Sequence, residues 1–171
     1  MRKLKAVDYK IISELMKNSR LSDRQVAKKL GTSQPTITRR RTELEKQGLL
    51  DYTAVPDLKK LGFELLTFTF GRWNLEKLPN AHIEEMKQFI EKHPGVIFMS
   101  TGSGLRWDKV IISVHRNYSD YTSLMQEFKT EFGGYYEIVS SFIVSLQSDT
   151  ILRNLTFKYL IKLLEDNYAK E

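Results

Sequence analysis

Apolar residues recur at helical spacing along the first fifty positions of the chain, and this pattern predicts three successive helices. The first is expected to begin near Asp8, which would cap it. Its core face would consist of Ile11, Ile12, Leu15 and Met16. The two helices that follow are short and lie on either side of a glycine, so we expect a compact helical domain at this end of the chain.

The signals that begin and end the second and third helices are specific. Ser22 and Gln25 are spaced as a capping box, and Gly31 supplies the left-handed residue that ends a helix. Ser33 can cap the third helix, and Pro35 falls within its first turn, where a missing N–H is tolerated. Two helices joined by a short turn with glycine indicate a DNA-binding helix-turn-helix.

The third helix would bury Ile37 and Leu44 and expose its N-terminal part. Gln, Thr and Arg side chains there can bond base edges, whereas further arginines suit phosphates. Arg41 is expected to bury its stem and to keep its guanidinium in solvent or on phosphate. The alternative is that the basic run 39–41 is only a solvated helix surface. The residues expected to contact DNA are Ser22, Arg24, Lys28, Lys29, Ser33, Gln34, Pro35, Thr36, Thr38, Arg39, Arg40 and Arg41.

Gly48 is expected to stop the third helix, and residues 49–55 should form a short strand or hairpin. Pro56 and Asp57 make a turn that opens a linker extending to Gly62. Three helices followed by a small ribbon form a winged helix-turn-helix, so we place the DNA-binding domain and its linker at residues 1–62.

Beyond the linker, apolar positions alternate with period two, which indicates strands. Leu66, Phe68 and Phe70 share one face of the first strand. Asn117 or Ser119 would cap the second helix of this region. The predicted elements are a strand at 63–73, a helix at 81–93, strands at 96–100 and 109–115, a helix ending at Gly133-Gly134, and a strand at 138–146.

This order is βαββαβ, a ferredoxin-like sandwich with helices on one sheet face, and we place it at residues 63–147. The apolar open face favours pairing with another subunit. Residues 148–171 form a C-terminal extension, expected to be helical over 156–166 and packed on the sheet domain or on a partner. An added edge strand before that helix is the alternative. The fold class is therefore α+β.

Charge is divided unevenly along the chain. Residues 1–62 hold 15 Lys and Arg against 7 Asp and Glu, a balance of +8, whereas residues 63–171 have a balance of −2. This asymmetry indicates that the N-terminal domain meets a polyanion. The absence of cysteine excludes disulfides and thiolate zinc sites. No apolar run resembles a membrane span, so we expect a cytoplasmic protein without a membrane partner.

The chain resembles the Lrp/AsnC, or feast/famine, transcription regulators. The shared frame has four parts: residues 7–15, residues 26–33 with Arg39-Arg40, residues 44–50, and Tyr52-Thr53-Ala54. Over residues 63–146 the likeness lies in the element order and in residues 94–96 and 101–102. The resemblance implies a regulator that binds pseudo-palindromic double-stranded DNA. It also implies a sheet domain of the RAM/ACT type that makes a homodimer, often assembled into tetramers or octamers. We expect no cofactor and no metal.

The resemblance also implies an amino-acid effector near a Thr-Gly-x-x-Asp loop between the second and third strands. Carried over, this site would involve Thr101, Gly102, Gly104 and Asp108. Residues 103–107 lengthen the loop before the aspartate, and a flexible hairpin is the alternative interpretation of these glycines.

Two other function classes remain open. One is an enzyme related to haem-pathway decarboxylases of the same architecture, for which His82, His93 and His115 offer the only candidate groups. None of them has the spacing of a metal or catalytic motif, so no enzyme activity is expected. The other is a winged helix that binds protein, although such modules seldom keep so basic a recognition helix.

Overall fold

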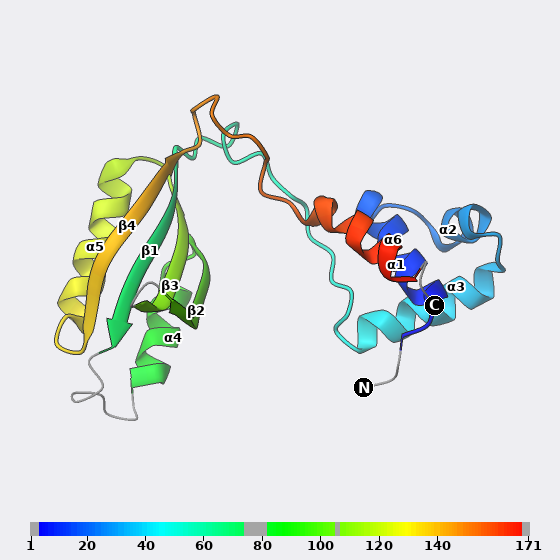
Figure 1. Ribbon diagram of the computed structural model, residues 1–171, viewed down its shortest axis with the longest axis horizontal. Helices are drawn as coiled ribbons and strands as arrows, with labels where there is room; N and C mark the ends of the chain where they lie inside the picture. The colour runs from blue at the N-terminus through cyan, green and yellow to red at the C-terminus, as the bar shows by residue number, and fades with distance from the viewer. Residues whose placement is uncertain (1–3, 74–81, 105–106, 169–171) are drawn as a thin grey trace. The chain divides into compact units, whose positions relative to one another are not determined.

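The computed structural model describes residues 4–73, 82–104 and 107–168. The chain divides into two compact units (Figure 1). One, here called the head unit, joins the chain up to Val55 with the chain from Arg153 onward. The other, the sheet unit, runs from Pro56 to Leu152. No helix within the described ranges is both long enough and apolar enough to cross a membrane.

The head unit begins with three helices: α1 (Ala6–Lys17), α2 (Asp23–Leu30) and α3 (Gln34–Lys46). Asp8 is not the cap of α1 but its third residue, and its carboxylate accepts from the backbone N–H of Lys5 at 2.8 Å. The helices enclose an apolar core as their periodicity predicted. The buried members are Ile11, Leu15, Leu21, Val26, Ala27, Ile37 and Leu44.

The predicted strand or hairpin at residues 49–55 is absent. The chain turns at Gly48 (φ 67°) and continues without regular secondary structure through Asp57. A strand requires a neighbour for its ladder hydrogen bonds, and no segment of the described chain pairs with this one. Leu49 and Leu50 instead pack on the three-helix core.

The C-terminal extension forms the 3₁₀ helix η2 (Phe157–Leu160) and the helix α6 (Ile161–Tyr168), which confirms its helical character. Helix α6 packs on α1 within the head unit (Figure 1), whereas the sequence placed it on the sheet domain or on a partner. Glu165 accepts from Lys17 at 2.8 Å, and the carboxylates of Glu165 and Glu14 raise the pKa of Lys17. Ser13, one turn before Lys17 on the face of α1 opposite the core, is buried. We attribute its burial to α6.

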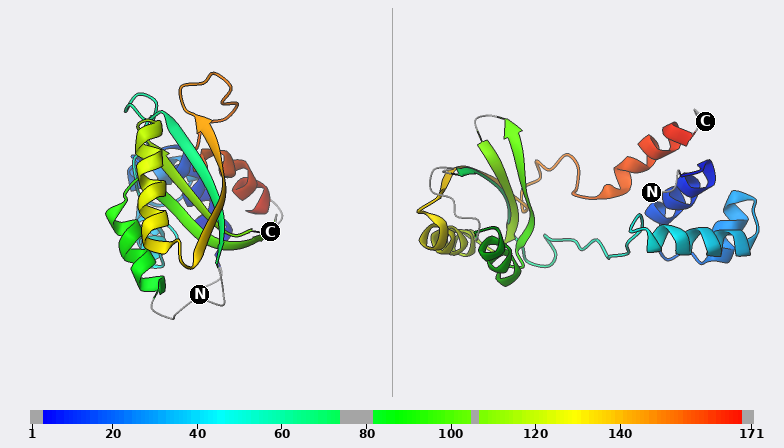
Figure 2. Two further views of the ribbon diagram at one scale, coloured as in Figure 1. Left: turned by 90° about the vertical axis from the view of Figure 1, so that its left-hand side faces the viewer. Right: turned by 90° about the horizontal axis from the view of Figure 1, so that it is seen from below.

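The sheet unit has the predicted βαββαβ order. Its elements are β1 (Leu65–Trp73), α4 (His82–Lys92), β2 (Val96–Gly104), β3 (Trp107–His115), α5 (Tyr118–Phe132) and β4 (Tyr136–Ser145). The strands are arranged β2-β3-β1-β4 and every neighbouring pair is antiparallel. Both helices cover one face (Figure 2), as expected. The predicted first residue of α4, Ala81, lies outside the described residues.

Successive side chains along each strand point to opposite faces of the sheet. Towards the helices, Ile111 packs with Phe89, Phe128 and other residues of a buried aromatic core. The other face carries a row of apolar side chains at paired positions that crosses the whole sheet, made of Phe142, Phe68, Ile112 and Phe98. Phe142 is 66 % exposed and Phe98 is 50 % exposed, so the ends of this row are open to solvent.

A buried polar cluster lies on the helix side of the sheet. Thr67, Ser113 and His115 are all nearly inaccessible to solvent. The Thr67 and Ser113 hydroxyls are 2.8 Å apart, and Nε2 of His115 lies 2.9 Å from the Ser113 hydroxyl. Burial lowers the pKa of His115, while Asp120 opposes the shift. The two hydroxyls and Nε2 of His115 thus bond to one another, as buried polar groups generally do.

Candidate nucleic-acid interface

Local capping fixes the two helices of the helix-turn-helix. The Ser22 hydroxyl accepts from the backbone N–H of Gln25, and the Gln25 side chain accepts from the backbone N–H of Ser22, so the predicted capping box is present. Gly31 has φ 61° and ends α2 in the left-handed conformation. Ser33 occupies the N-cap position of α3, but its hydroxyl bonds the Thr36 hydroxyl at 2.8 Å and caps no backbone group. The predicted side-chain cap at Ser33 is therefore absent, whereas the capping box and the left-handed glycine are present as predicted.

The exposed edge of α3 carries the groups that can bond bases. Gln34, Pro35, Thr38 and Arg39 are exposed, whereas Thr36 is half-buried. Thr42 is exposed one turn after Thr38 and belongs to the same edge. The sequence interpretation missed Thr42, although helical spacing from Thr38 would have found it.

Of the three adjacent arginines, Arg39 is the one that projects outward. Its side chain is 59 % exposed, and its guanidinium donates to Glu43 at 3.0 Å. An exposed i,i+4 pair of this kind contributes only about 0.3–0.5 kcal/mol. A base edge or a phosphate can therefore displace Glu43 at small cost.

The expected phosphate contact of Arg40 is wrong. Its side chain is buried, and its guanidinium lies 3.3 Å from the buried carboxylate of Asp8 on α1. The helical period explains this placement, because Arg40 follows Ile37 by three residues and precedes Leu44 by four, on the core face. Arg40 therefore joins α3 to α1 and is not available to DNA.

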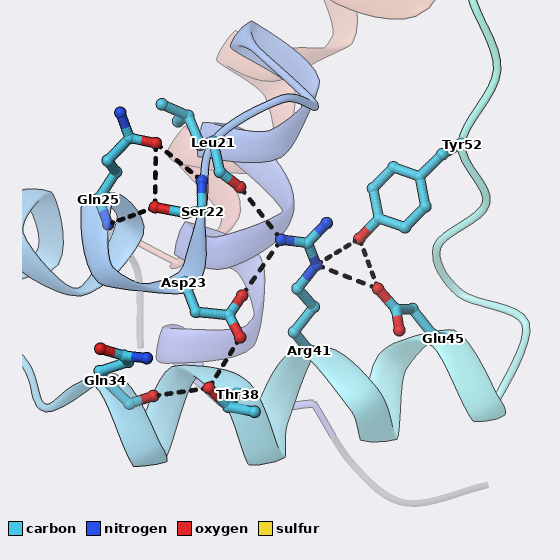
Figure 3. Close-up of polar contacts among 9 residues, drawn as sticks. All are labelled: Leu21, Ser22, Asp23, Gln25, Gln34, Thr38, Arg41, Glu45 and Tyr52. Carbon is cyan, nitrogen blue, oxygen red and sulfur yellow. Dashed lines mark hydrogen bonds and ion pairs between the residues drawn. The ribbon is translucent and has the colours of Figure 1, made fainter.

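Arg41 is also committed within the protein, contrary to the expectation of a guanidinium in solvent or on phosphate. It donates to the Leu21 carbonyl and the Asp23 carboxylate, each at 3.1 Å, and through Nε to Glu45 at 3.1 Å (Figure 3). The same Nε donates to the Tyr52 hydroxyl at 2.9 Å. Arg41 thus connects the start of α2, the end of α3 and the segment that follows the helices.

Tyr52 closes this group from the other side. Its ring centroid lies 4.9 Å from the Arg41 guanidinium carbon, and its hydroxyl donates to Glu45 at 2.8 Å. Burial raises the pKa of Tyr52, and Glu45 raises it further. The phenol therefore keeps its proton and serves as donor to Glu45 and acceptor from Arg41.

Helix α2 contributes a second set of cations. Ser22, Arg24, Lys28 and Lys29 are all exposed, as a phosphate-binding role requires. Lys29 donates to Glu14 of α1 at 2.7 Å. Hydrogen bonds from Lys29 and Lys17 lower the pKa of Glu14.

The proposed effector residues lie along a hairpin rather than in a loop. Strand β2 continues to Gly104, four residues past its predicted end, and the ladder runs from Thr101 opposite Lys109 to Gly104 opposite Trp107. Ser103 and Gly104 thus extend β2 and Trp107 begins β3, with a register shift between the pairs of Thr101 and Gly104. Thr101, Gly102 and Gly104 are exposed, and Asp108 on β3 is half-buried. Across the described ranges, no group of three His, Asp or Glu is arranged to hold a metal ion.

Comparison with known proteins gives consistent matches. The model of a winged helix-turn-helix DNA-binding family matches residues 4–51. The HTH-type transcriptional regulator LrpC of Bacillus subtilis is 36 % identical over 97 residues, 56 % of this chain and 64 % of LrpC. An uncharacterized HTH-type transcriptional regulator of Pyrococcus abyssi is 44 % identical over 87 residues, 50 % of this chain and 58 % of that protein. These matches span less than two thirds of either relative.

A longer match is to an uncharacterized HTH-type transcriptional regulator of Pyrococcus furiosus, 34 % identical over 117 residues, 67 % of this chain and 74 % of that protein. The solved structure of B. subtilis LrpC superposes with a TM-score of 0.68 at 26 % identity, covering 89 % of this chain and all of that one. A Neisseria meningitidis regulator solved with L-Met has a TM-score of 0.72 at 17 % identity, covering 91 % and 96 %, and shows the shared fold. The chain belongs to the Lrp/AsnC family of transcriptional regulators.

Proposed function

We propose that the chain is a sequence-specific, DNA-binding transcription regulator that acts in the cytoplasm. The observation that carries this proposal is the exposed edge of α3, where the polar side chains of Gln34, Thr38, Arg39 and Thr42 are all exposed. Side chains of these types read base edges in the major groove. Arg24, Lys28 and Lys29 of α2, with Ser22 and Ser33, would bond phosphates on either side of the groove.

We further propose that the regulator is a homodimer joined through the open face of the sheet. The row of apolar side chains from Phe142 to Phe98 supports this, because large exposed apolar patches on soluble proteins mark interfaces. A two-fold dimer presents two recognition helices, and it would therefore bind pseudo-palindromic sites with half-sites about one helical turn apart or a multiple of that.

A small effector such as an amino acid is proposed to bind at the hairpin that carries Thr101, Gly102, Gly104 and Asp108. The family supports this part of the proposal, since a regulator of the same fold was solved with L-Met. Calorimetric titration of the purified protein with each amino acid tests it. If no amino acid gives a heat of binding, the effector part of the proposal is wrong. The proposed DNA binding is not affected by that outcome.

The experiment that tests the main proposal is a selection of bound fragments from genomic DNA, followed by titration of the enriched site against random DNA. Arg39→Ala should weaken the enriched site by about 1–3 kcal/mol and random DNA much less. Arg116→Ala, an exposed arginine of the sheet unit, serves as the matched control and should change neither. A wild-type protein that enriches no fragment at low salt would overturn the proposal.

A further inference from the structure

The hydroxyl of Thr38, in the middle of the exposed edge of α3, has already committed its hydrogen within the protein. It donates to Oδ2 of Asp23, the first residue of α2, at 2.7 Å (Figure 3). The Gln34 carbonyl one turn earlier lies 3.1 Å from the same hydroxyl and shares that hydrogen. A threonine hydroxyl has a single hydrogen but two lone pairs, so what remains for a DNA base is an acceptor.

The carboxylate that takes this hydrogen is itself held in place. Oδ1 of Asp23 accepts from the Arg41 guanidinium at 3.1 Å, so its two oxygens have different partners. Arg41 cannot turn away, because it also donates to the Leu21 carbonyl and, through Nε, to Glu45. The side chains of Asp23 and Arg41 are only 22 % and 20 % exposed. A charge-assisted bond between partly buried partners is stronger than a neutral one in water.

We propose that Asp23, fixed by Arg41, makes Thr38 an acceptor-only reader that selects a base with an exocyclic amino group. Adenine N6 and cytosine N4 are donors in the major groove, whereas guanine O6 and N7 and thymine O4 are acceptors. An acceptor facing guanine or thymine leaves two lone pairs opposed and unpaired. This assignment rests on the proposed function, because it requires the exposed edge of α3 to enter the major groove.

An isosteric substitution at Asp23 reverses the hydrogen bond. In Asp23→Asn, Arg41 can only donate, so it selects the amide oxygen and leaves the amide N–H₂ facing Thr38. Thr38 then accepts from Asn through one lone pair, and its hydrogen is left to the Gln34 carbonyl or to a base. The substitution keeps the shape of the side chain, while Thr38 is no longer restricted to accepting from a base.

The experiment is a selection from randomised duplex DNA with the full-length wild-type protein, Asp23→Asn and Thr38→Val. The wild type should enrich adenine or cytosine at one position of each half-site, at about tenfold over guanine and thymine. Asp23→Asn should lose this preference at that position and leave the other positions as in the wild type. Thr38→Val should show no preference there, because its side chain has no hydrogen-bonding atom.

Glu45→Gln is the matched control. It also removes one negative charge from a partner of Arg41, but Glu45 does not contact Thr38, so the selected sequence should stay that of the wild type. An unaltered base pattern in Asp23→Asn or in Thr38→Val would overturn the proposal while DNA recognition by α3 stands. If Asp23→Asn fails to fold, the base pattern selected by Thr38→Val still tests the proposal. A wild type that enriches no sequence would overturn the proposed function together with this assignment.

Discussion

The guanidinium of Arg40 on α3 and the carboxylate of Asp8 on α1 form a buried ion pair at 3.3 Å, and it holds the recognition helix on the body of the head unit. Asp8 also accepts from the backbone N–H of Lys5 at the start of α1. Arg40 has no polar surface left for DNA, because its side chain is only 9 % exposed. The pair therefore determines where α3 lies rather than which sequence it reads.

Breaking this pair should destabilise the head unit strongly. Arg40→Met leaves the Asp8 carboxylate buried without its cation, which typically costs about 3–5 kcal/mol. The double variant Asp8→Leu/Arg40→Met removes both charges and should recover a large part of that loss. Urea unfolding followed by circular dichroism measures both. If the double variant is no more stable than Arg40→Met, the two side chains do not depend on each other.

The exposed cations of α2 should determine part of the salt dependence of DNA binding. Each phosphate that a variant no longer neutralises lowers the slope of log K against log salt concentration by about 0.9, so Arg24→Ala and Lys28→Ala should each flatten it by nearly one. Titrations between 50 and 200 mM salt, roughly the range over which such slopes are resolved, provide the measurement. Lys60→Ala removes one exposed charge from the sheet unit and should leave the slope intact. If both α2 variants keep the wild-type slope, Arg24 and Lys28 do not contact phosphates and DNA binds at another surface.

A charge on the open face of the sheet should separate the proposed dimer. Phe142→Glu puts a carboxylate into the apolar row at a position already 66 % exposed, so the unit itself should fold normally. An unpaired buried charge costs several kcal/mol, enough to weaken association at least a hundredfold. Sedimentation equilibrium should show a fall to the 20.0 kDa of one chain. Tyr118→Glu, equally exposed on α5 (62 %), should remain dimeric. If both variants behave alike, the interface lies on another surface.

Acid should weaken the sheet unit through His115. Burial lowers its pKa below the ordinary value of 6.5, so the unfolded chain binds this proton more readily than the folded one. Stability is therefore complete above pH 6.5 and declines as the pH falls from there towards the lowered pKa. Urea unfolding followed by tryptophan fluorescence reports this unit, because Trp73 and Trp107 both belong to it. In His115→Asn the decline between pH 7 and 5.5 should disappear; its persistence would assign the acid sensitivity to another group.

Removal of the C-terminal helix should weaken the head unit and leave the sheet unit unchanged. A chain that ends at Leu152 uncovers the face of α1 that carries Ser13, at an expected cost of about 1–3 kcal/mol. Circular dichroism should show an earlier helical transition, whereas tryptophan fluorescence should unfold at the wild-type urea concentration. The control Glu165→Gln removes only an exposed ion pair, worth at most about 1 kcal/mol. Coincident shifts of both signals would mean that the extension supports the whole molecule.

Local signals were sufficient to predict most of the elements. The capping box at Ser22 and Gln25 and the left-handed Gly31 involve residues at most a few positions apart, so their geometry is encoded within the segment itself. The period-two pattern of Leu66, Phe68 and Phe70 likewise identified β1 and the apolar character of the open face. The helix order and strand order followed because ferredoxin-like connections are few.

The predictions that were wrong concern residues whose contacts are made with segments distant in sequence. Arg39, Arg40 and Arg41 look alike along the chain, but Asp8 lies 32 positions before Arg40, and Asp23 lies 18 before Arg41. Nothing near α6 indicates that it packs on α1, because helical spacing gives a face but not its neighbour. The strand expected at residues 49–55 failed for the related reason that a ladder needs a second segment.

Because α6 covers α1, the head unit is assembled from residues at both extremes of the numbering. During synthesis its three-helix core emerges first, and more than a hundred further residues must be translated before α6 can reach it. At about 5–20 residues per second, the bare side of α1 stays uncovered on the ribosome for on the order of ten seconds. The nascent regulator therefore passes through a stage in which α3 is already folded while α6 has not yet packed on α1.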